Sequence, residues 1–149
     1  MANLVVTVSE SVTINGALRG SSNSLTVTDI TDTFERVITC PQSATTTIAT
    51  FSSNVYDSAG ALDKENVRYI RVSNLSATHD IEIGVAGTAS NYSMLIPAGN
   101  SHLIARADDV MLAEADAVPT YGSLADIAKL EVRPTATTDV DVEIFVASI

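Results

Sequence analysis

The sequence predicts an all-β protein, a single-domain antiparallel β-sandwich with jelly-roll or Greek-key connections. Short strand-like runs separated by Gly, Asn, Ser, Asp and Pro recur along the 149 residues. Thr and Val are abundant, Trp is absent and aromatic residues make up 5% of the chain, a composition that favours pleated sheet over helix. No convincing long helix is visible and no long period repeats, which disfavours a solenoid or a propeller. A chain of this length makes one domain, residues 1–149.

The first third of the chain contains the strongest turn signal, Asn15-Gly16, between strand-like runs. Residues 19–24 are polar and are expected to form a loop. Pro41 ends a strand because it has no N–H for a ladder. The strands expected here are residues 4–8, 11–14, 25–29, 34–39 and 45–51.

The rest of the chain is expected to supply six further strands. Residues 66–73 are apolar on both faces, which predicts a central strand or one covered by a neighbouring subunit. Residues 97–100, Pro-Ala-Gly-Asn, form a turn signature. The strands expected here are residues 66–73, 80–85, 92–96, 102–105, 127–133 and 140–146.

Two segments are harder to assign. Residues 56–65 indicate a loop, with room for one helical turn. Residues 108–126 have some helical propensity, but a strand followed by a loop at 117–123 fits the architecture better.

The last strand has the cleanest alternation in the chain. Its inward residues are Val140, Val142, Ile144 and Val146, and the acidic residues between and before them, Asp139, Asp141 and Glu143, are expected to face outward.

Charge narrows the class of partner. The chain has 8 basic and 18 acidic side chains and a formal net charge of −10, which disfavours nucleic acid and anionic membranes. The N-terminus has no signal-peptide pattern, so we expect synthesis in a cytoplasm without export by a visible signal. The mean hydropathy of +0.24 suggests apolar surface buried against another subunit, and hence a homo-oligomer.

No residue pattern indicates catalysis, a cofactor or a metal centre, and we expect a non-enzymatic protein. His79 and His102 have no nucleophile in a recognisable motif, and Cys40 has only apolar or neutral neighbours and is expected to be a buried thiol. Calcium is a weaker alternative, with hard oxygen ligands in the acidic groups Asp29/Asp32, Asp108/Asp109 and Asp139/Asp141/Glu143. None matches a calcium loop, and we interpret the last group as a solvated strand face or as partners for arginines of an adjoining subunit.

Four stretches carry a resemblance: residues 10–16 (ESVTING), 34–41 (FERVITCP), 65–75 (ENVRYIRVSNL) and 140–148 (VDVEIFVAS). They resemble small jelly-roll virion proteins of tailed phages of marine bacteria and cyanobacteria. The resemblance implies a structural role in the virion, as a capsid decoration or cement protein or as a head–tail, tail or fibre component. It implies no catalytic residue.

Within that class we expect a protein on the assembled head, in contact with the major capsid protein and with copies of itself. Residues 1–8 are expected to form an extended arm or a strand that contacts a neighbour, with Leu4, Val6 and Val8 as contacts. The loops around Arg19 and Arg106 are the other candidate contacts. The alternatives are a tail protein, a module that binds a host glycan, and a self-assembling surface or filament protein.

Overall fold

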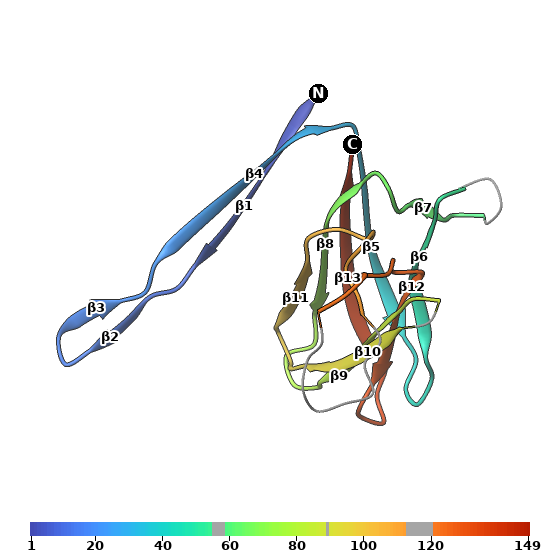
Figure 1. Ribbon diagram of the computed structural model, residues 1–149. Coiled ribbons are helices and arrows are strands. Elements are labelled where there is room, and N and C mark those ends of the chain that lie inside the picture. The colour runs from blue at the N-terminus through green and yellow to red at the C-terminus, as the bar shows by residue number, and fades with distance from the viewer. Residues whose placement is uncertain (55–58, 89, 113–120) are drawn as a thin grey trace.

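Figure 1 shows the computed structural model, which describes residues 1–54, 59–88, 90–112 and 121–149. These residues form strands, turns and loops without a helix. They build an antiparallel β-sandwich, as the sequence predicts, and a long β-hairpin that projects from it (Figure 1).

Two sheets make up the sandwich. The first has the order β11-β8-β13-β5 and consists of β5 (Asp32–Cys40), β8 (Val67–Asn74), β11 (Ser101–Ile104) and β13 (Val140–Ser148). The second has the order β10-β9-β12-β6-β7 and consists of β6 (Thr46–Ser52), β7 (Leu62–Asp63), β9 (Ile81–Ala86), β10 (Asn91–Ile96) and β12 (Lys129–Pro134). All pairings within the two sheets are antiparallel except the two-residue pairing of β6 with β7.

The chain crosses repeatedly between the two sheets. Strand β5 pairs with β13, and β6 pairs with β12, although each pair is distant in sequence. A plain meander, in which neighbours in sequence pair, is therefore excluded for the sandwich.

One core lies between the sheets, and alternation along the strands builds it. The predicted inward residues of β13 are all buried, and in the opposite sheet Ile83 on β9 and Leu130 on β12 are inaccessible to solvent. Cys40 is fully buried at the end of β5, as predicted.

Strand β8 is central, as its two apolar faces predict. It lies between β11 and β13. Ile70 and Val72 are fully buried in the core, and Tyr69 is buried on the outer face of the sheet.

The projecting hairpin consists of β1 (Ala2–Ser9), β2 (Val12–Ile14), β3 (Ala17–Arg19) and β4 (Ser22–Ile30). Strand β1 pairs with β4, and β2 pairs with β3 in continuation of the same register. Asn15 and Gly16 have φ angles of 52° and 77° and form the predicted turn, since the tight hairpin turn needs positive φ at both positions. We call residues 2–30 the arm and residues 12–19 its tip.

The expected loop at residues 19–24 is wrong. Arg19 ends β3 and Ser22 begins β4, so only Gly20 and Ser21 interrupt the pairing. The segment is polar because both faces of the arm meet solvent here, and a solvated strand and a loop have similar compositions.

Two other expectations change. In the segment 56–65, residues 59–65 form a turn and β7 rather than a helical turn, and residues 56–58 lie outside the described part. Instead of the strand expected after residue 108, the described residues up to 112 make an isolated bridge between Met111 and Ala125. Most of the expected loop at 117–123 also lies outside the described residues.

Candidate functional site

The base of the arm is fixed to the outer face of the first sheet. Leu4, Val6, Val27 and Ile30 of the arm form a second apolar cluster with Tyr69, Phe145 and Ala147 of the sandwich. The rings of Tyr69 and Phe145 meet edge to face with centroids 6.1 Å apart. At the exit of the arm, the Thr31 N–H donates to the Ser148 carbonyl over 2.9 Å. The arm is therefore anchored at its base.

Along β1 and β4 the arm has two chemically different faces, because opposite residues of an antiparallel pair share a face. One face is mostly apolar and contains the pairs Leu4/Val27 and Val6/Leu25 together with Val8, which lies opposite Asn23. Apart from Val5, the other face bears hydroxyl groups, from Thr7, Ser9, Ser22, Ser24 and Thr26. The hairpin is amphipathic, and its apolar face turns toward the sandwich at the base.

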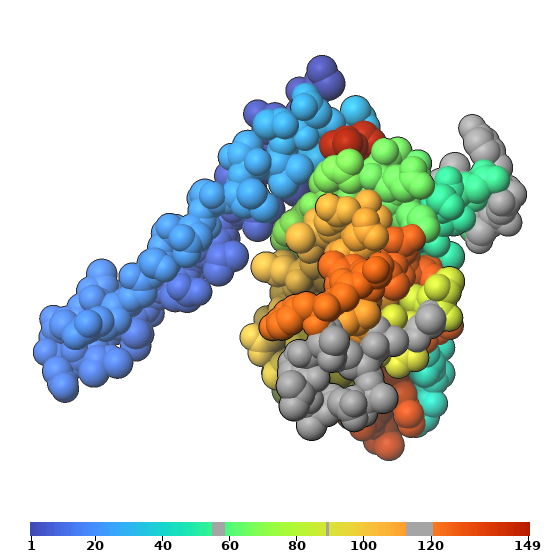
Figure 2. All heavy atoms as spheres, viewed as in Figure 1, coloured from blue at the N-terminus to red at the C-terminus, as the bar shows by residue number. Residues whose placement is uncertain are grey.

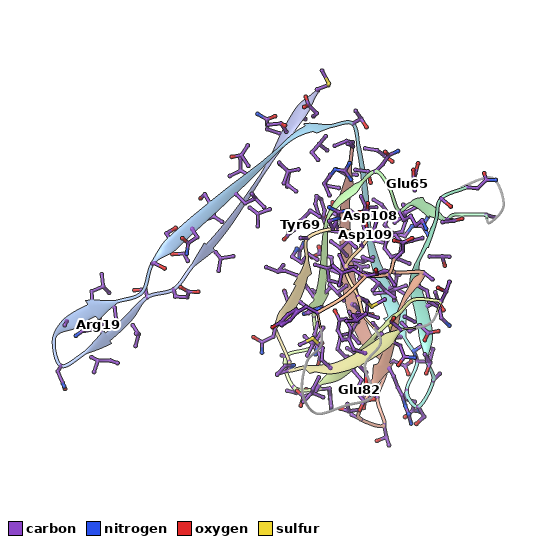
Figure 3. The ribbon with its side chains drawn as sticks, viewed as in Figure 1. Arg19, Glu65, Tyr69, Glu82, Asp108 and Asp109 are labelled. Carbon is purple, nitrogen blue, oxygen red and sulfur yellow. The ribbon has the colours of Figure 1, made fainter. Side chains whose placement is uncertain are left out.

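The arm diverges from the sandwich along β1 and β4, and its far end stands apart from the sandwich (Figure 2). The tip carries three large aliphatic side chains in solvent: Val12 is 51% exposed, Ile14 55% and Leu18 74%. Arg19 lies at this distal end, away from the sandwich (Figure 3).

A groove of about 360 Å³ lies where the arm diverges from the sandwich. Figure 2 shows the separation of the two parts on the side of β11. The arm contributes Val6, Val8, Asn23, Ser24 and Leu25, and the sandwich contributes Tyr69, Leu103, Ile104 and Ala105. None of these side chains is charged at neutral pH: Tyr69 is the one titratable group among them, and burial raises its pKa further above neutrality. The groove suits an apolar occupant.

The residues expected as partner contacts fall into two groups. Leu4, Val6 and Val8 lie together on the apolar face of the arm, and Arg19 lies farther out on the same arm. Arg106 is separate: its Nε and Nη2 donate to the carboxylate of Asp108 over 2.8 and 2.9 Å. Its guanidinium is thus already engaged within its own loop.

Sequence reasoning missed the other half of this surface. Leu25 lies opposite Val6 on β4, and Leu103 is 44% exposed on β11 across the groove. A signal for Leu25 exists: the alternation before Asn15-Gly16 continues after it in a matching register. Nothing in the sequence brings Leu103 to this place.

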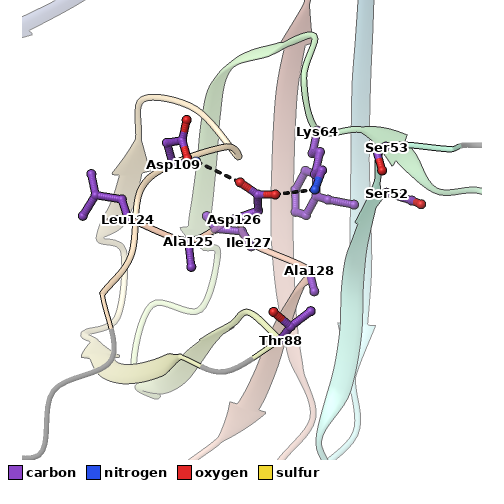
Figure 4. A pocket seen from close by; sticks show the side chains of 11 residues that line it. Ser52, Ser53, Lys64, Thr88, Asp109, Leu124, Ala125, Asp126, Ile127 and Ala128 are labelled. Atoms are coloured by element: carbon purple, nitrogen blue, oxygen red, sulfur yellow. Dashed lines mark hydrogen bonds and ion pairs between the residues drawn. The ribbon is translucent and has the colours of Figure 1, made fainter. Parts of the chain in front are cut away.

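A second, polar pocket of about 490 Å³ surrounds an ion pair (Figure 4). Lys64 Nζ bonds Asp126 Oδ2, and the Asp109 N–H donates to the other Asp126 oxygen over 3.1 Å. The Lys64 hydrogen bond is the main cause that holds the pKa of Asp126 below its usual range, and the same bond raises the pKa of Lys64. Both groups stay charged near neutral pH, so neither is suited to proton transfer there. The pair links the turn beside β7 to the segment before β12.

The remaining titratable groups of interest are also held by neighbours. His102 Nε2 lies 3.1 Å from Tyr92 Oη, and burial lowers the pKa of His102. His79 lies in the turn before β9, with Nδ1 3.0 Å from Thr78 Oγ1. Burial raises the pKa of the Cys40 thiol, which disfavours the reactive thiolate.

The acidic groups weighed as calcium ligands are partly engaged within the chain. Asp141 accepts a hydrogen bond from Thr39 Oγ1 over 2.7 Å, and Asp139 accepts one from the Gln42 N–H over 2.8 Å. Glu143, interpreted as solvated or paired across subunits, forms an ion pair of 2.6 Å with Arg71 of the same chain. In the described ranges, no group of three or more His, Cys, Asp or Glu side chains is placed to hold a metal ion.

Comparison with known proteins gives no match, whether to a family model, a curated sequence or a solved structure. The part of the chain that the structure describes contains no helix long and apolar enough to cross a bilayer. The arm and its groove are therefore the features from which a function is inferred.

Proposed function

We propose that the chain is a non-enzymatic structural subunit of a phage virion, a capsid decoration or cement protein that holds neighbouring subunits together through its arm. The observation that carries the proposal is the arm itself. It is an amphipathic hairpin fixed at its base, with aliphatic side chains exposed at its far end.

An isolated two-stranded hairpin is marginal in water, because it buries little apolar surface and leaves a free backbone edge on each strand. The tip has this arrangement, with Ile14 and Leu18 in solvent. Full burial of one such side chain contributes roughly 1.5–3 kcal/mol. The tip gains most when another polypeptide covers it, which suits a subunit that works by contact.

The strand order of the sandwich supports the same class of protein. Among its eight longer strands, the first, third, sixth and eighth form one sheet, and the second, fourth, fifth and seventh form the other. This is the order expected of a jelly roll, an architecture used in viral capsids and also in lectins and cupins. The sandwich is compatible with a capsid module, and the exposed arm supports an assembly role over ligand binding.

The charge distribution favours the outside of a head over its DNA-filled interior. Residues 1–31 contain only Glu10, Arg19 and Asp29 as charged side chains, so the sandwich carries nearly all of the net charge of −10. Such a surface repels phosphate, whereas the nearly neutral arm can approach other proteins at little electrostatic cost.

The test is co-sedimentation of the purified protein with decoration-free heads of the encoding phage. We expect saturable binding at a stoichiometry set by the capsid lattice. The matched variant has residues 11–20 replaced by Asn-Gly, which joins the hydrogen-bonded residues Glu10 and Ser21 through a tight turn and removes the tip together with Ser11 and Gly20. This variant should fold and should lose most of its binding.

Two outcomes would overturn the proposal. No binding of the wild-type chain to heads would move the assignment to a tail or fibre component, most clearly if the chain is a stable trimer. Equal binding of the wild-type and shortened chains would show that the arm is not the contact.

A further inference from the structure

We infer that the groove between arm and sandwich is the docking site for the arm tip of a second copy of this chain. The inference rests on the proposed assembly role and names the partner that the arm takes. Each copy would then offer one tip and receive one.

The groove has the features of a site for a β-hairpin. Leu25 on the arm and Leu103 on the sandwich line it, and each is about half exposed. Strand β11 forms part of its wall and is an edge strand, paired with β8 alone among the described strands. Its free backbone edge can accept a further strand, while the groove takes the side chains of that strand.

The tip has the matching features. Strands β2 and β3 have three residues each, against four in β11, so the lengths are comparable. Val12 and Ile14 share one face of the tip and Leu18 lies on the other, so aliphatic surface is available on either side.

The tip cannot fill the groove of its own chain. The groove wall is formed by Val6, Val8 and Leu25, which lie between the base of the arm and its tip. To reach this wall the arm would have to fold back on itself and break the continuous β1–β4 register. The occupant is therefore another molecule.

Charge favours a second copy as that molecule. Two copies with a net charge of −10 repel each other, and the repulsion costs least where they meet through uncharged surface. The groove has no charged side chain, and within the tip only Arg19 is charged. A strongly basic partner would be drawn instead to the acidic faces of the sandwich.

A tip-to-groove contact joins two different surfaces. Such a contact continues from copy to copy until a ring closes, the smallest being a reciprocal pair. We expect a closed oligomer with as many junctions as subunits.

A complementation experiment in sedimentation velocity tests this arrangement. The tip variant is Ile14→Ser/Leu18→Ser, the groove variant is Leu103→Asp, and the control is Leu95→Asp. Leu95 is 50% exposed on β10 of the opposite sheet, comparable with Leu103. All four positions are exposed, so the thermal unfolding of each variant should match that of the wild type.

We expect the wild type and the control to associate, and the tip and groove variants each to stay monomeric. A one-to-one mixture of the two variants should form a dimer, because one intact tip meets one intact groove. A monomeric wild type at tens of micromolar, association of either single variant like wild type, or a mixture that stays monomeric would each overturn the inference.

Crosslinking locates the contact directly. One chain carries Ile14→Cys, the other Leu103→Cys, and copper phenanthroline oxidises the paired thiols to a disulfide. The native Cys40 is fully buried and should not react. We expect a covalent dimer when the Ile14→Cys and Leu103→Cys chains are mixed, and none when the Leu95→Cys chain replaces the Leu103→Cys chain. Equal yields of dimer with the Leu103→Cys and Leu95→Cys chains, or no dimer with either, would overturn the inference.

These tests separate the two proposals. Binding to heads without a tip-to-groove junction leaves the decoration role standing and removes the present inference. A tip-to-groove junction without binding to heads removes the decoration role and leaves the present inference standing.

Discussion

Gly20→Ala is expected to disable the arm while leaving the sandwich intact. Gly20 has a φ of 122°, in the region that favours glycine, and it lies where the pairing between β2–β3 and β1–β4 is interrupted. A Cβ atom at this position would lie 2.0 Å from the Glu10 carbonyl oxygen. That oxygen is backbone, so the two strands would have to separate.

The cost has two parts. Holding alanine at this φ costs about 1–3 kcal/mol. Separating the strands also breaks the 2.9 Å hydrogen bond from the Glu10 N–H to the Ser21 carbonyl, worth about 1 kcal/mol. A total of about 2–4 kcal/mol exceeds the stability expected of an isolated hairpin, so the distal part of the arm should lose its pairing.

The loss should appear in binding. If only the paired tip docks, the apparent Kd rises as the population of the paired tip falls. A cost of about 2–4 kcal/mol then raises the apparent Kd by between about thirty-fold and several hundred-fold. The assay is a sedimentation titration of self-association, with hydrogen exchange at the Glu10 amide as the local readout.

Gly16→Ala is the matched control, because Gly16 also has positive φ but has nothing within 4 Å of its Cβ direction. It carries only the cost of positive φ, about 1–2 kcal/mol, so it should weaken association less than Gly20→Ala does, and neither variant should change the midpoint of unfolding of the sandwich. Wild-type affinity in Gly20→Ala, or unfolding of the whole chain, would refute the reasoning.

Three further predictions concern the sandwich. Ile144→Ala removes a fully buried side chain and should lower the free energy of unfolding in urea by about 2–5 kcal/mol. The control is Val37→Ala, which changes an exposed side chain of β5 and should alter the free energy of unfolding by less than about 0.5 kcal/mol. Equal effects of the two substitutions would contradict the burial of Ile144 in the core. Because the pKa of Asp126 is lowered in the fold, its pair with Lys64 stabilises above about pH 4 and this contribution is lost as pH falls through the folded pKa. Lys64→Met should thus be less stable than wild type at pH 6, by at most about 1 kcal/mol since both groups are partly exposed, and the gap should close in acid; a gap that persists in acid would speak against the pair. Finally, Cys40 should resist iodoacetamide in the folded protein and react in urea, and fast labelling of the native chain would disprove its burial.

Local patterns explain why much of the sandwich could be predicted. The period-two alternation of β13 depends only on which residues face the core, and the turn at Asn15-Gly16 depends on two φ angles that these residues tolerate. The two apolar faces of β8 likewise predict that both faces of the strand are buried.

The arm and its groove could not be predicted in full. Alternation predicts an apolar face on β1 but does not tell whether that face packs against a core or lines an open groove. The approach of Leu25 to Leu103 depends on the angle at which the arm leaves the sandwich, which is set by tertiary packing around Tyr69. The engagement of Arg106 by Asp108 is equally a matter of loop geometry.

The most direct test of the central claim is a cryo-electron microscopy map of heads that carry the bound protein. The account predicts density for residues 2–30 as a paired hairpin, with its tip seated on a neighbouring subunit and either the Ile14 face or the Leu18 face of the tip covered. A map in which the sandwich is bound to the head while the arm projects into solvent would contradict it.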